Sequence, residues 1–153
     1  MDWRIRSLLK DNFCSSPWMH IRVTPDGHFW PCRWAWDGID KDDLYHVKDY
    51  TIQEFFQTST VMQDIRTQML HGEQPDMCKV CHYESSMGKV SGRQRQLLKS
   101  GIDLQRFNRT FCNSKHFKHF EYTYHNNGHT ERYPTDLQID LGNTCNSSCI
   151  MCR

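Results

Sequence analysis

The sequence has almost no net charge and no long apolar run. Its 19 Lys and Arg residues nearly balance 18 Asp and Glu residues, which gives a formal net charge of +1. This balance gives no reason to expect a nucleic acid or an anionic membrane as a partner. No window approaches the roughly 18 apolar residues that span a bilayer, and residues 1–12 are charged and hold no apolar stretch of signal-peptide length. We therefore expect a cytoplasmic protein that binds neither membranes nor nucleic acids.

Cysteine, in contrast, is abundant, with 8 residues in a chain of 153. Thiols in the cytoplasm are kept reduced, so many cysteines in such a protein indicate metal or redox chemistry rather than disulfides. The alternative is a secreted scaffold held by disulfides, and the lack of an export signal argues against it. The length suits one ordinary domain, or a small domain and the start of another.

A β-hairpin is predicted over residues 18–32. Apolar and polar residues alternate from Ile21 to Thr24, and residues 25–27 (Pro-Asp-Gly) have the composition of a turn, because proline presets φ and glycine accepts positive φ. Cys14 precedes this hairpin and Cys32 closes it. Since a hairpin brings its two ends together, these two cysteines are expected to be neighbours in space.

Three helical segments are predicted after the hairpin. Thr51 and Glu54 have the pattern of a capping box at the start of a short helix. Ser59 is the expected cap of a second helix, whose apolar residues fall at helical spacing as far as Gly72. A third stretch runs roughly over residues 84–100, and the two glycines within it weaken it.

The last third of the chain is harder to interpret. Residues 103–133 are rich in His, Asn and aromatic residues and show no clean period. After them, Leu137, Ile139 and Leu141 alternate with polar residues, which predicts a strand that runs directly into the last cysteines. The whole pattern predicts an α+β protein with a hairpin, about three helices and one lone strand.

The first set of cysteines consists of Cys14, Cys32, Cys78 and Cys81. Two residues separate Cys78 from Cys81, which is ordinary spacing for a metal knuckle. Four thiolates can complete the coordination of a [4Fe–4S] cluster, and the same four can hold a structural zinc ion. The bland interpretation of Cys112 is a buried or half-exposed free thiol, and the alternative is a role as fourth ligand of the auxiliary cluster or as a residue near the substrate.

The second set consists of Cys145, Cys149 and Cys152, with three and then two residues between them. Three thiolates leave one iron of a [4Fe–4S] cluster with an open position, where a substrate group can bind as it does in catalytic metal sites. The alternative is a zinc site with a fourth ligand from a residue such as His116 or His119.

This spacing, with the preceding strand and residues 142–144 (Gly-Asn-Thr), resembles the cluster loop of the radical S-adenosylmethionine (SAM) superfamily. The resemblance implies that Cys145, Cys149 and Cys152 hold the [4Fe–4S] cluster that binds SAM. It implies that an electron from this cluster cleaves SAM to a 5′-deoxyadenosyl radical. It also places Met151 near the adenine, at a position that is usually hydrophobic in the family.

The first set resembles the SPASM and twitch auxiliary-cluster domains of radical SAM enzymes. The resemblance is carried by Cys14 and the hairpin that ends at Cys32, followed by the pair Cys78 and Cys81. It implies an auxiliary [4Fe–4S] cluster on these four cysteines, in a module that here precedes the triad, whereas it usually follows the barrel. Residues 91–93 (Ser-Gly-Arg) resemble a stretch after the second pair in twitch-type proteins, to which we assign no chemical role.

These resemblances imply an organisation in three parts. Residues 1–101 are the auxiliary-cluster domain, residues 102–134 a linker, and residues 135–153 the first strand and cluster loop of a truncated (β/α) barrel, since a complete one needs about 200 residues. We therefore expect the N-terminal part of a radical SAM enzyme, not active alone. A peptide or protein substrate and a reductase or ferredoxin-type electron donor are the expected partners. The alternative is a non-enzymatic zinc- or iron–sulfur-binding module.

One basic run lies between the two cysteine sets. Lys89, Arg93, Arg95 and Lys99 follow one another at short intervals. Such a run is usually a solvated helix face, and no recognised nucleic-acid-binding motif accompanies it. We therefore expect these four side chains on the surface.

Overall fold

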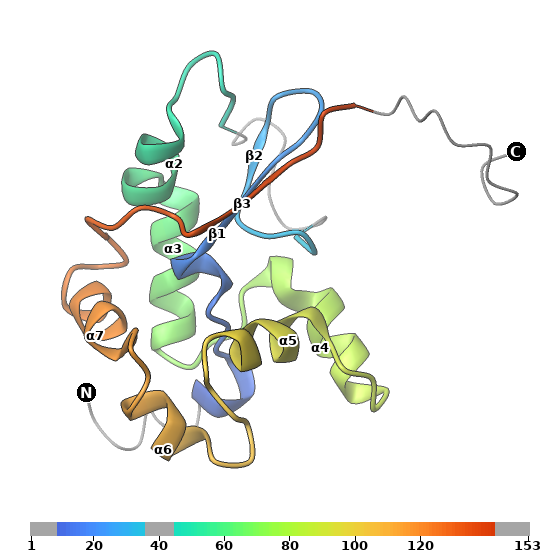
Figure 1. Ribbon diagram of the computed structural model, residues 1–153, viewed down its shortest axis with the longest axis vertical. Helices are drawn as coiled ribbons and strands as arrows, with labels where there is room; N and C mark the ends of the chain where they lie inside the picture. Colours follow the sequence, from blue (N-terminus) through green and yellow to red (C-terminus); the bar gives the residue numbers. More distant parts are fainter. Residues whose placement is uncertain (1–8, 36–44, 143–153) are drawn as a thin grey trace, which may run out of the picture.

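The computed structural model describes residues 9–35 and 45–142. This part contains six α-helices and three strands, with short 3-10 helices between them, and the predicted α+β class is confirmed (Figure 1). None of the described helices is long and apolar enough to cross a membrane. In chain order the elements are η1 (Ser16–Trp18), β1 (His20–Val23), β2 (Phe29–Trp30), α2 (Ile52–Thr58), α3 (Thr60–Leu70), η3 (Asp76–Cys78), α4 (Lys79–Ser86), α5 (Gly92–Lys99), α6 (Phe107–Cys112), α7 (Phe117–His125) and β3 (Asp136–Ile139).

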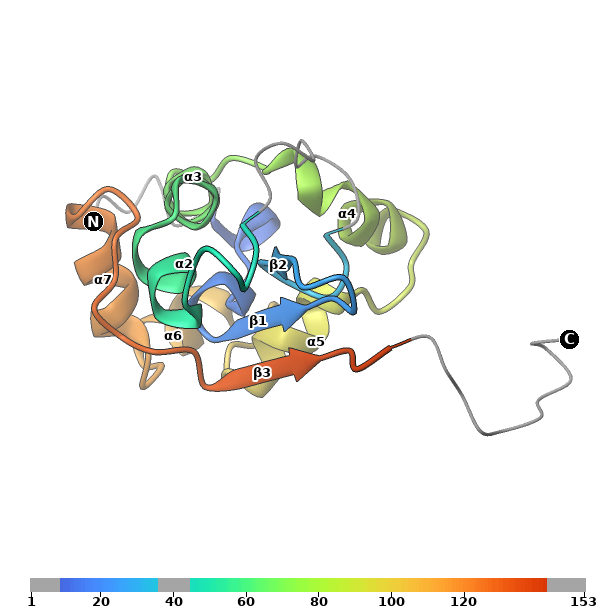
Figure 2. The ribbon, with the colours of Figure 1, turned by 90° about the horizontal axis from the view of Figure 1, so that it is seen from above.

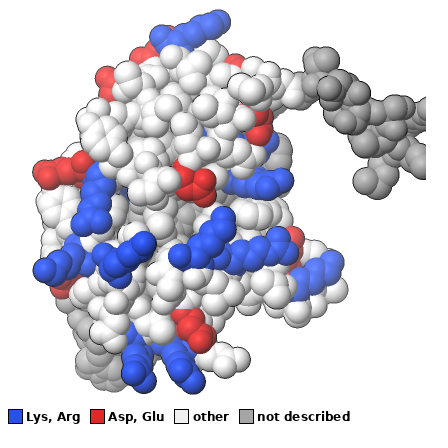
Figure 3. Space-filling model, viewed as in Figure 1, with Lys and Arg blue, Asp and Glu red and all other residues white. Residues whose placement is uncertain are grey.

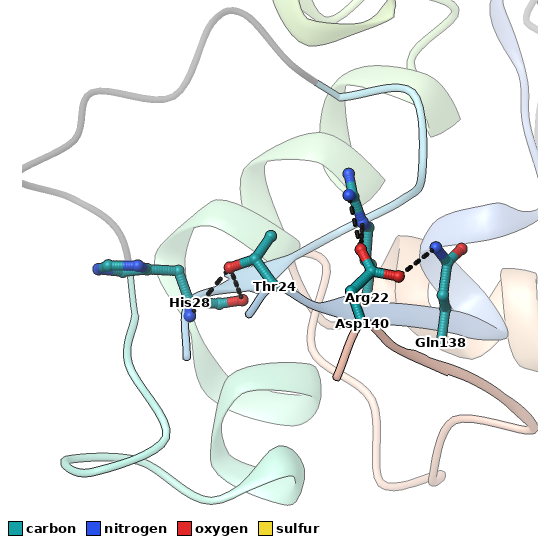
Figure 4. Close-up of polar contacts among 5 residues, drawn as sticks. All are labelled: Arg22, Thr24, His28, Gln138 and Asp140. Atoms are coloured by element: carbon teal, nitrogen blue, oxygen red, sulfur yellow. Dashed lines mark hydrogen bonds and ion pairs between the residues drawn. The ribbon is translucent and has the colours of Figure 1, made fainter. Parts of the chain in front are cut away.

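The three strands form one sheet in the order β2-β1-β3. β1 and β2 are antiparallel, with Arg22 opposite Trp30, so the predicted hairpin is confirmed. Its turn contains Gly27 at φ +86°, a left-handed conformation that favours glycine. Thr24 Oγ1 accepts a hydrogen bond from His28 N at 3.1 Å and donates one to His28 O at 3.1 Å, which fastens the base of the turn (Figure 4).

β3 is not the lone strand that the sequence predicted. It pairs in parallel with β1, with Val23 opposite Ile139, and runs beside β1 at the outer edge of the sheet in Figure 2. Arg22 Nε donates to Asp140 Oδ2 at 2.7 Å, and Gln138 Nε2 donates to Asp140 Oδ1 at 2.9 Å (Figure 4). Arg22 and Asp140 are 118 residues apart in sequence. The lone-strand prediction was wrong because pairing over such a separation leaves no local pattern in the sequence.

The first two predicted helices are confirmed with their caps. At the start of α2, Thr51 Oγ1 accepts from Glu54 N at 3.1 Å and Thr51 N donates to Glu54 Oε2 at 2.7 Å. Ser59 caps α3, because its Oγ accepts from Met62 N at 3.2 Å. The chain leaves α3 through Gly72, at φ +79°. The caps therefore fix where both helices begin.

The third predicted helix is two helices in the structure. α4 ends before Gly88, whose φ of +71° reverses the chain, and α5 begins after Ser91. Ser91 Oγ accepts from Gln94 N, and Ser91 N donates to Gln94 Oε1 at 2.9 Å, so the two residues form a second capping box. A serine followed by glutamine three residues later was the signal in the sequence that marks this start.

Aromatic side chains from both halves of the chain meet around Phe13. Its ring centroid lies 5.1 Å from that of Trp18 and 5.0 Å from those of Phe111 and Phe120. Phe111 belongs to α6 and Phe120 to α7, two helices that the sequence did not predict within residues 102–134. The segment expected as a linker therefore packs into the same core as the cysteine-rich segment before it.

Arg66 of α3 lies at the centre of the interior and is fully buried. Its guanidinium donates to three backbone carbonyls, those of Pro17 at 2.9 Å, Gly128 at 3.1 Å and Phe56 at 2.6 Å. It also lies 4.6 Å from the centre of the Phe56 ring. Burial lowers the pKa of Arg66 to about 9. This side chain joins the segment around η1, the end of α2 and the turn after α7.

Candidate metal centre

Four cysteine side chains line one cavity in the part of the chain that the structure describes. Cys14 precedes η1, Cys32 follows β2, Cys78 ends η3 and Cys81 lies in the first turn of α4. All four are free thiols, and each is buried or half-buried. The structure thus brings together at one cavity the four cysteines that the sequence analysis grouped as the first set.

Local structure explains why these side chains meet. The antiparallel pairing of β1 and β2 returns the chain, so that Cys32 comes close to Cys14. Cys78 and Cys81 are three residues apart at the junction of η3 and α4, and residues at this spacing on a helix share one face. Pro75 has an extended backbone conformation and is the N-cap of η3, so the helical turn that carries Cys78 begins at Asp76.

Burial keeps the free thiols protonated. It raises the pKa of Cys14 to about 12 and the pKa of Cys32 to about 11, and the neighbouring cysteines add to both shifts. Burial is also the first cause that raises the pKa of Cys78 and of Cys81. A metal group must therefore displace protons from these sulfurs, since thiolates and not thiols are the ligands.

Backbone N–H groups point at the sulfur atoms. Ser16 N lies 3.4 Å from Cys14 Sγ. Hydrogen bonds from the backbone of Trp34 lower the pKa of Cys32, and those from Arg93 and Gly92 lower the pKa of Cys81, each against the larger effect of burial. Donors of this kind stabilise thiolates and raise the reduction potential of iron–sulfur clusters.

The remaining walls of the cavity are mostly apolar. Ile65 and Met69 of α3, Met77 of η3 and the indole of Trp34 all line it. The indole lies directly on the start of α5, because a Cβ added at Gly92 would stand 2.6 Å from a Trp34 ring atom. Gly92 therefore permits the close contact that covers this side of the cavity.

The chemistry of the donor set fits an iron–sulfur cluster. Soft thiolate ligands select zinc, copper(I) and iron–sulfur clusters, and four cysteines are the usual ligands of a [4Fe–4S] cluster. Within residues 9–35 and 45–142, no three His, Cys, Asp or Glu side chains are arranged to hold a single metal ion. The four thiols stand around the cavity, on segments that come from three parts of the sequence.

The remaining candidate residues that the structure describes are not among those that line the cavity. Cys145, Cys149, Cys152 and Met151 lie outside the described residues. Cys112 ends α6, packs against the aromatic core as a half-buried free thiol, and is not among the residues that line the cavity. His119, which was considered as a zinc ligand, does not line the cavity, and its Nε2 lies 2.5 Å from Thr130 Oγ1.

Two of the residues that line the cavity were not assigned to it from the sequence. Gly92 and Arg93 line the cavity, although Arg93 was expected on a solvated helix face and is in fact buried. That prediction was wrong because α5 begins one residue earlier than Arg93 and directs its first turn at the cysteines.

Comparison with known families gives one match. Residues 14–82 match the family model of SPASM, an iron–sulfur cluster-binding domain. The SPASM match begins at Cys14 and ends one residue after Cys81, so it contains all four cysteines of the cavity. No curated protein and no solved structure matches the chain. The SPASM match supports iron–sulfur binding, as the resemblance of this segment predicted.

Proposed function

We propose that Cys14, Cys32, Cys78 and Cys81 hold an auxiliary [4Fe–4S] cluster and that the chain acts as the cluster-binding part of a radical SAM enzyme. The observation that carries the proposal is the convergence of these four thiols on one cavity inside the SPASM match. The thiols come from three parts of the sequence, since Cys78 and Cys81 share the junction of η3 and α4, and the other lining residues include no His, Asp or Glu.

The residues of the chain supply ligands, hydrogen bonds and shielding. The four thiols give up protons when the site is filled, and backbone N–H groups at Ser16 and at the start of α5 stabilise the resulting negative charge by donating hydrogen bonds to the sulfurs. Trp34 and the side chains of Met69 and Met77 exclude water from the cavity. A [4Fe–4S] cluster bound in such a place supplies one-electron transfer, and its potential depends on hydrogen bonds to sulfur and on solvent exposure.

The proposal extends to the second set of cysteines. Cys145, Cys149 and Cys152 would hold a further [4Fe–4S] cluster with an open iron for SAM, with Met151 beside the adenine. Their spacing supports this assignment. The activity would be reductive cleavage of SAM to a 5′-deoxyadenosyl radical, directed at a peptide or protein substrate.

An electron-donor protein is the expected partner of such an enzyme. Figure 3 shows Lys and Arg side chains gathered across the middle and lower part of one face, with fewer Asp and Glu between them. The segment from α5 to α7 carries the exposed basic residues Arg95, Lys99, Arg106, Arg109, Lys115 and Lys118. A surface of this kind supports association with an acidic reductase or ferredoxin-type protein, because complementary charge speeds docking.

Anaerobic reconstitution with iron and sulfide tests the proposal. We expect roughly eight irons per chain, since each [4Fe–4S] cluster holds four, with broad sulfur-to-iron charge-transfer absorbance. The double variant Cys78→Ala/Cys81→Ala and the triple variant Cys145→Ala/Cys149→Ala/Cys152→Ala should each retain roughly four irons. Cys112→Ala is the matched control and should load as the unchanged chain does.

Two outcomes would contradict the proposal. A colourless protein with stoichiometric zinc after reconstitution would favour the structural zinc module. Loss of all iron in the triple variant would show that the upstream cysteines hold no cluster of their own.

A further inference from the structure

One buried side chain at the cysteine cavity is only partly satisfied. Arg93, the second residue of α5, is 7% exposed and lines the cavity together with the four cysteines. Its Nη1 donates to Lys10 O at 3.1 Å and to Phe13 O at 3.3 Å. Its Nε is buried and has no hydrogen-bond partner among the described residues. A buried donor without an acceptor costs free energy. A group bound in the cavity that accepts a hydrogen bond from Arg93 Nε would therefore stabilise the protein.

The charge of Arg93 is also uncompensated by protein groups nearby. None of the ion pairs between described residues involves it. Arginine stays protonated in proteins, and a buried unpaired cation is costly. The ionisable groups that face it are the thiols of Cys14, Cys78 and Cys81, together with Asp11 and His82. Asp11 is exposed to solvent, which screens its charge.

The backbone at the start of α5 is directed at the same place. Hydrogen bonds from the backbone of Arg93 and Gly92 to Cys81 lower the pKa of that thiol against the effect of burial. The N-terminus of a helix carries partial positive charge from its free N–H groups. Backbone and side chain of Arg93 thus both offer positive charge to the cavity that holds the thiols.

We propose that Arg93 is a positioning residue that balances the negative charge of the thiolate set and donates through its Nε–H to the group bound there. The inference rests on the proposed function, in which the four cysteines hold a [4Fe–4S] cluster. A [4Fe–4S] core held by four thiolates is an anion, and one-electron reduction adds a further negative charge. A fixed cation beside it therefore favours the reduced state and raises the reduction potential.

The test compares variants of Arg93 with a matched variant of Arg95, an exposed arginine of the same helix. Arg93→Gln, Arg93→Lys and Arg95→Gln are made in the Cys145→Ala/Cys149→Ala/Cys152→Ala chain, so that only the upstream cluster is present. The midpoint potential is measured by dye-mediated reductive titration followed by electron paramagnetic resonance. For Arg93→Gln the ratio of reduced to oxidised cluster at a fixed potential should fall about tenfold, which equals ~59 mV for a one-electron couple.

The controls separate charge balance from a packing role. Arg93→Lys should keep a potential closer to the unchanged value because it keeps the charge, and Arg95→Gln should leave the potential unchanged. If Arg93 only anchors the backbone at Lys10 and Phe13, Arg93→Gln will lower the unfolding temperature and keep the potential of the unchanged cluster. That result would overturn the inference.

A second measurement covers the case in which Arg93→Gln takes up no iron. The iron content of Arg93→Lys after reconstitution is then compared with that of Arg93→Gln and Arg95→Gln. Arg93→Lys keeps the positive charge and should take up iron, and equally low iron uptake by Arg93→Lys and Arg93→Gln contradicts the inference. Absence of any iron uptake by the chain with Arg93 intact contradicts the proposed function instead, so the two failures are distinguishable.

Discussion

At the scale of single residues, the buried side chains of Arg66, Arg93 and His119 are accommodated in three different ways. Arg66 keeps its charge and donates hydrogen bonds to three backbone carbonyls. Arg93 donates hydrogen bonds through Nη1, whereas its Nε has no partner among the described residues, and its side chain lines the cysteine cavity. His119 of α7 is 4% exposed, and its Nε2 lies 2.5 Å from Thr130 Oγ1. The two arginines stay charged at pH 7, since even full burial leaves the pKa of Arg66 at about 9, whereas a buried histidine becomes neutral.

His119 predicts how stability depends on pH. Burial is the main cause that lowers its pKa from 6.5 to about 3, with Arg132 and Arg66 adding to the shift. The folded state therefore holds His119 neutral, and the unfolded chain takes up a proton below pH 6.5. The stability from this site is fully present above that pH and is lost as the pH falls toward 3.

Between pH 7 and pH 5 the loss should be about 2 kcal/mol, because each unit of pKa difference is worth about 1.4 kcal/mol. Urea unfolding at both pH values checks it against His119→Gln, which lacks the titrating ring. The free energy of unfolding of the two proteins should converge as the pH falls. A constant difference across this range would contradict a neutral buried His119.

At the scale of elements, two capping boxes of the same kind lie in different surroundings. Thr51 and Glu54 begin α2 at the surface. Ser91 and Gln94 begin α5 in the interior, where Ser91 is fully buried and its Oγ also accepts from Ser85 Oγ at 2.9 Å. The second cap thus joins the end of α4, the helix whose first turn carries Cys81, to the start of α5, which carries Arg93.

We predict that Ser91→Ala destabilises the protein more than Thr51→Ala. Loss of an exposed cap costs about 1 kcal/mol, whereas Ser91→Ala removes a cap that is fully buried, together with its hydrogen bond to the Ser85 hydroxyl, and should cost about 2 kcal/mol. Urea unfolding of the metal-free proteins at pH 7 measures both. Equal losses for the two variants would show that the contact between Ser85 and Ser91 contributes nothing.

The sequence predicted those elements whose signals are local. The turn at residues 25–27, the capping box at Thr51 and the serine before α3 all depend on neighbours within four residues, and all three are confirmed. α6 and α7 have no such signal, because neither has a side-chain hydrogen bond at its N-cap. Their helical form depends on the packing of Phe111 and Phe120 against Phe13, which is a long-range contact.

In the candidate site, too, the sequence predicted some residues and missed others. Spacing and the hairpin suggested two pairs, the resemblance to SPASM and twitch domains joined them into one set of Cys14, Cys32, Cys78 and Cys81, and the structure places all four at one cavity. Arg93 was not assigned to it, since the other members of its basic run, Lys89, Arg95 and Lys99, are exposed and its burial follows only from the position of α5. A residue that reaches the site by tertiary packing carries no periodic or spacing signal.

At the scale of the whole molecule, the cysteine cavity and the sheet belong to one unit. β1 carries Arg22, whose charge lowers the pKa of Cys32, although burial raises that pKa by more. The same guanidinium lies 2.6 Å from Asp140 Oδ2, just after β3. The pairing of β1 with β3 therefore fixes the segment that leads to the second set of cysteines relative to the first set.

This arrangement predicts that filling the upstream site stabilises the entire fold. The four thiols come from segments whose relative positions exist only in the folded chain, so a bound cluster favours the folded state by mass action. A ligand at a hundredfold excess over its dissociation constant adds about 2.7 kcal/mol, which corresponds to about 5–10 °C in the unfolding temperature of a chain of this size.

The measurement compares reconstituted and metal-free protein by circular dichroism in sealed cuvettes, in the Cys145→Ala/Cys149→Ala/Cys152→Ala chain. Cys78→Ala/Cys81→Ala in the same background is the control and should gain nothing from reconstitution, because two of its four ligands are missing. The unfolding temperature from the near-ultraviolet signal of the aromatic core around Phe13 should rise as much as that from the far-ultraviolet signal of the helices. The reason is that α6 and α7 pack on the segment that carries Cys14. A cluster that raised the unfolding temperature of the cavity alone would show instead that the core of α6 and α7 unfolds independently.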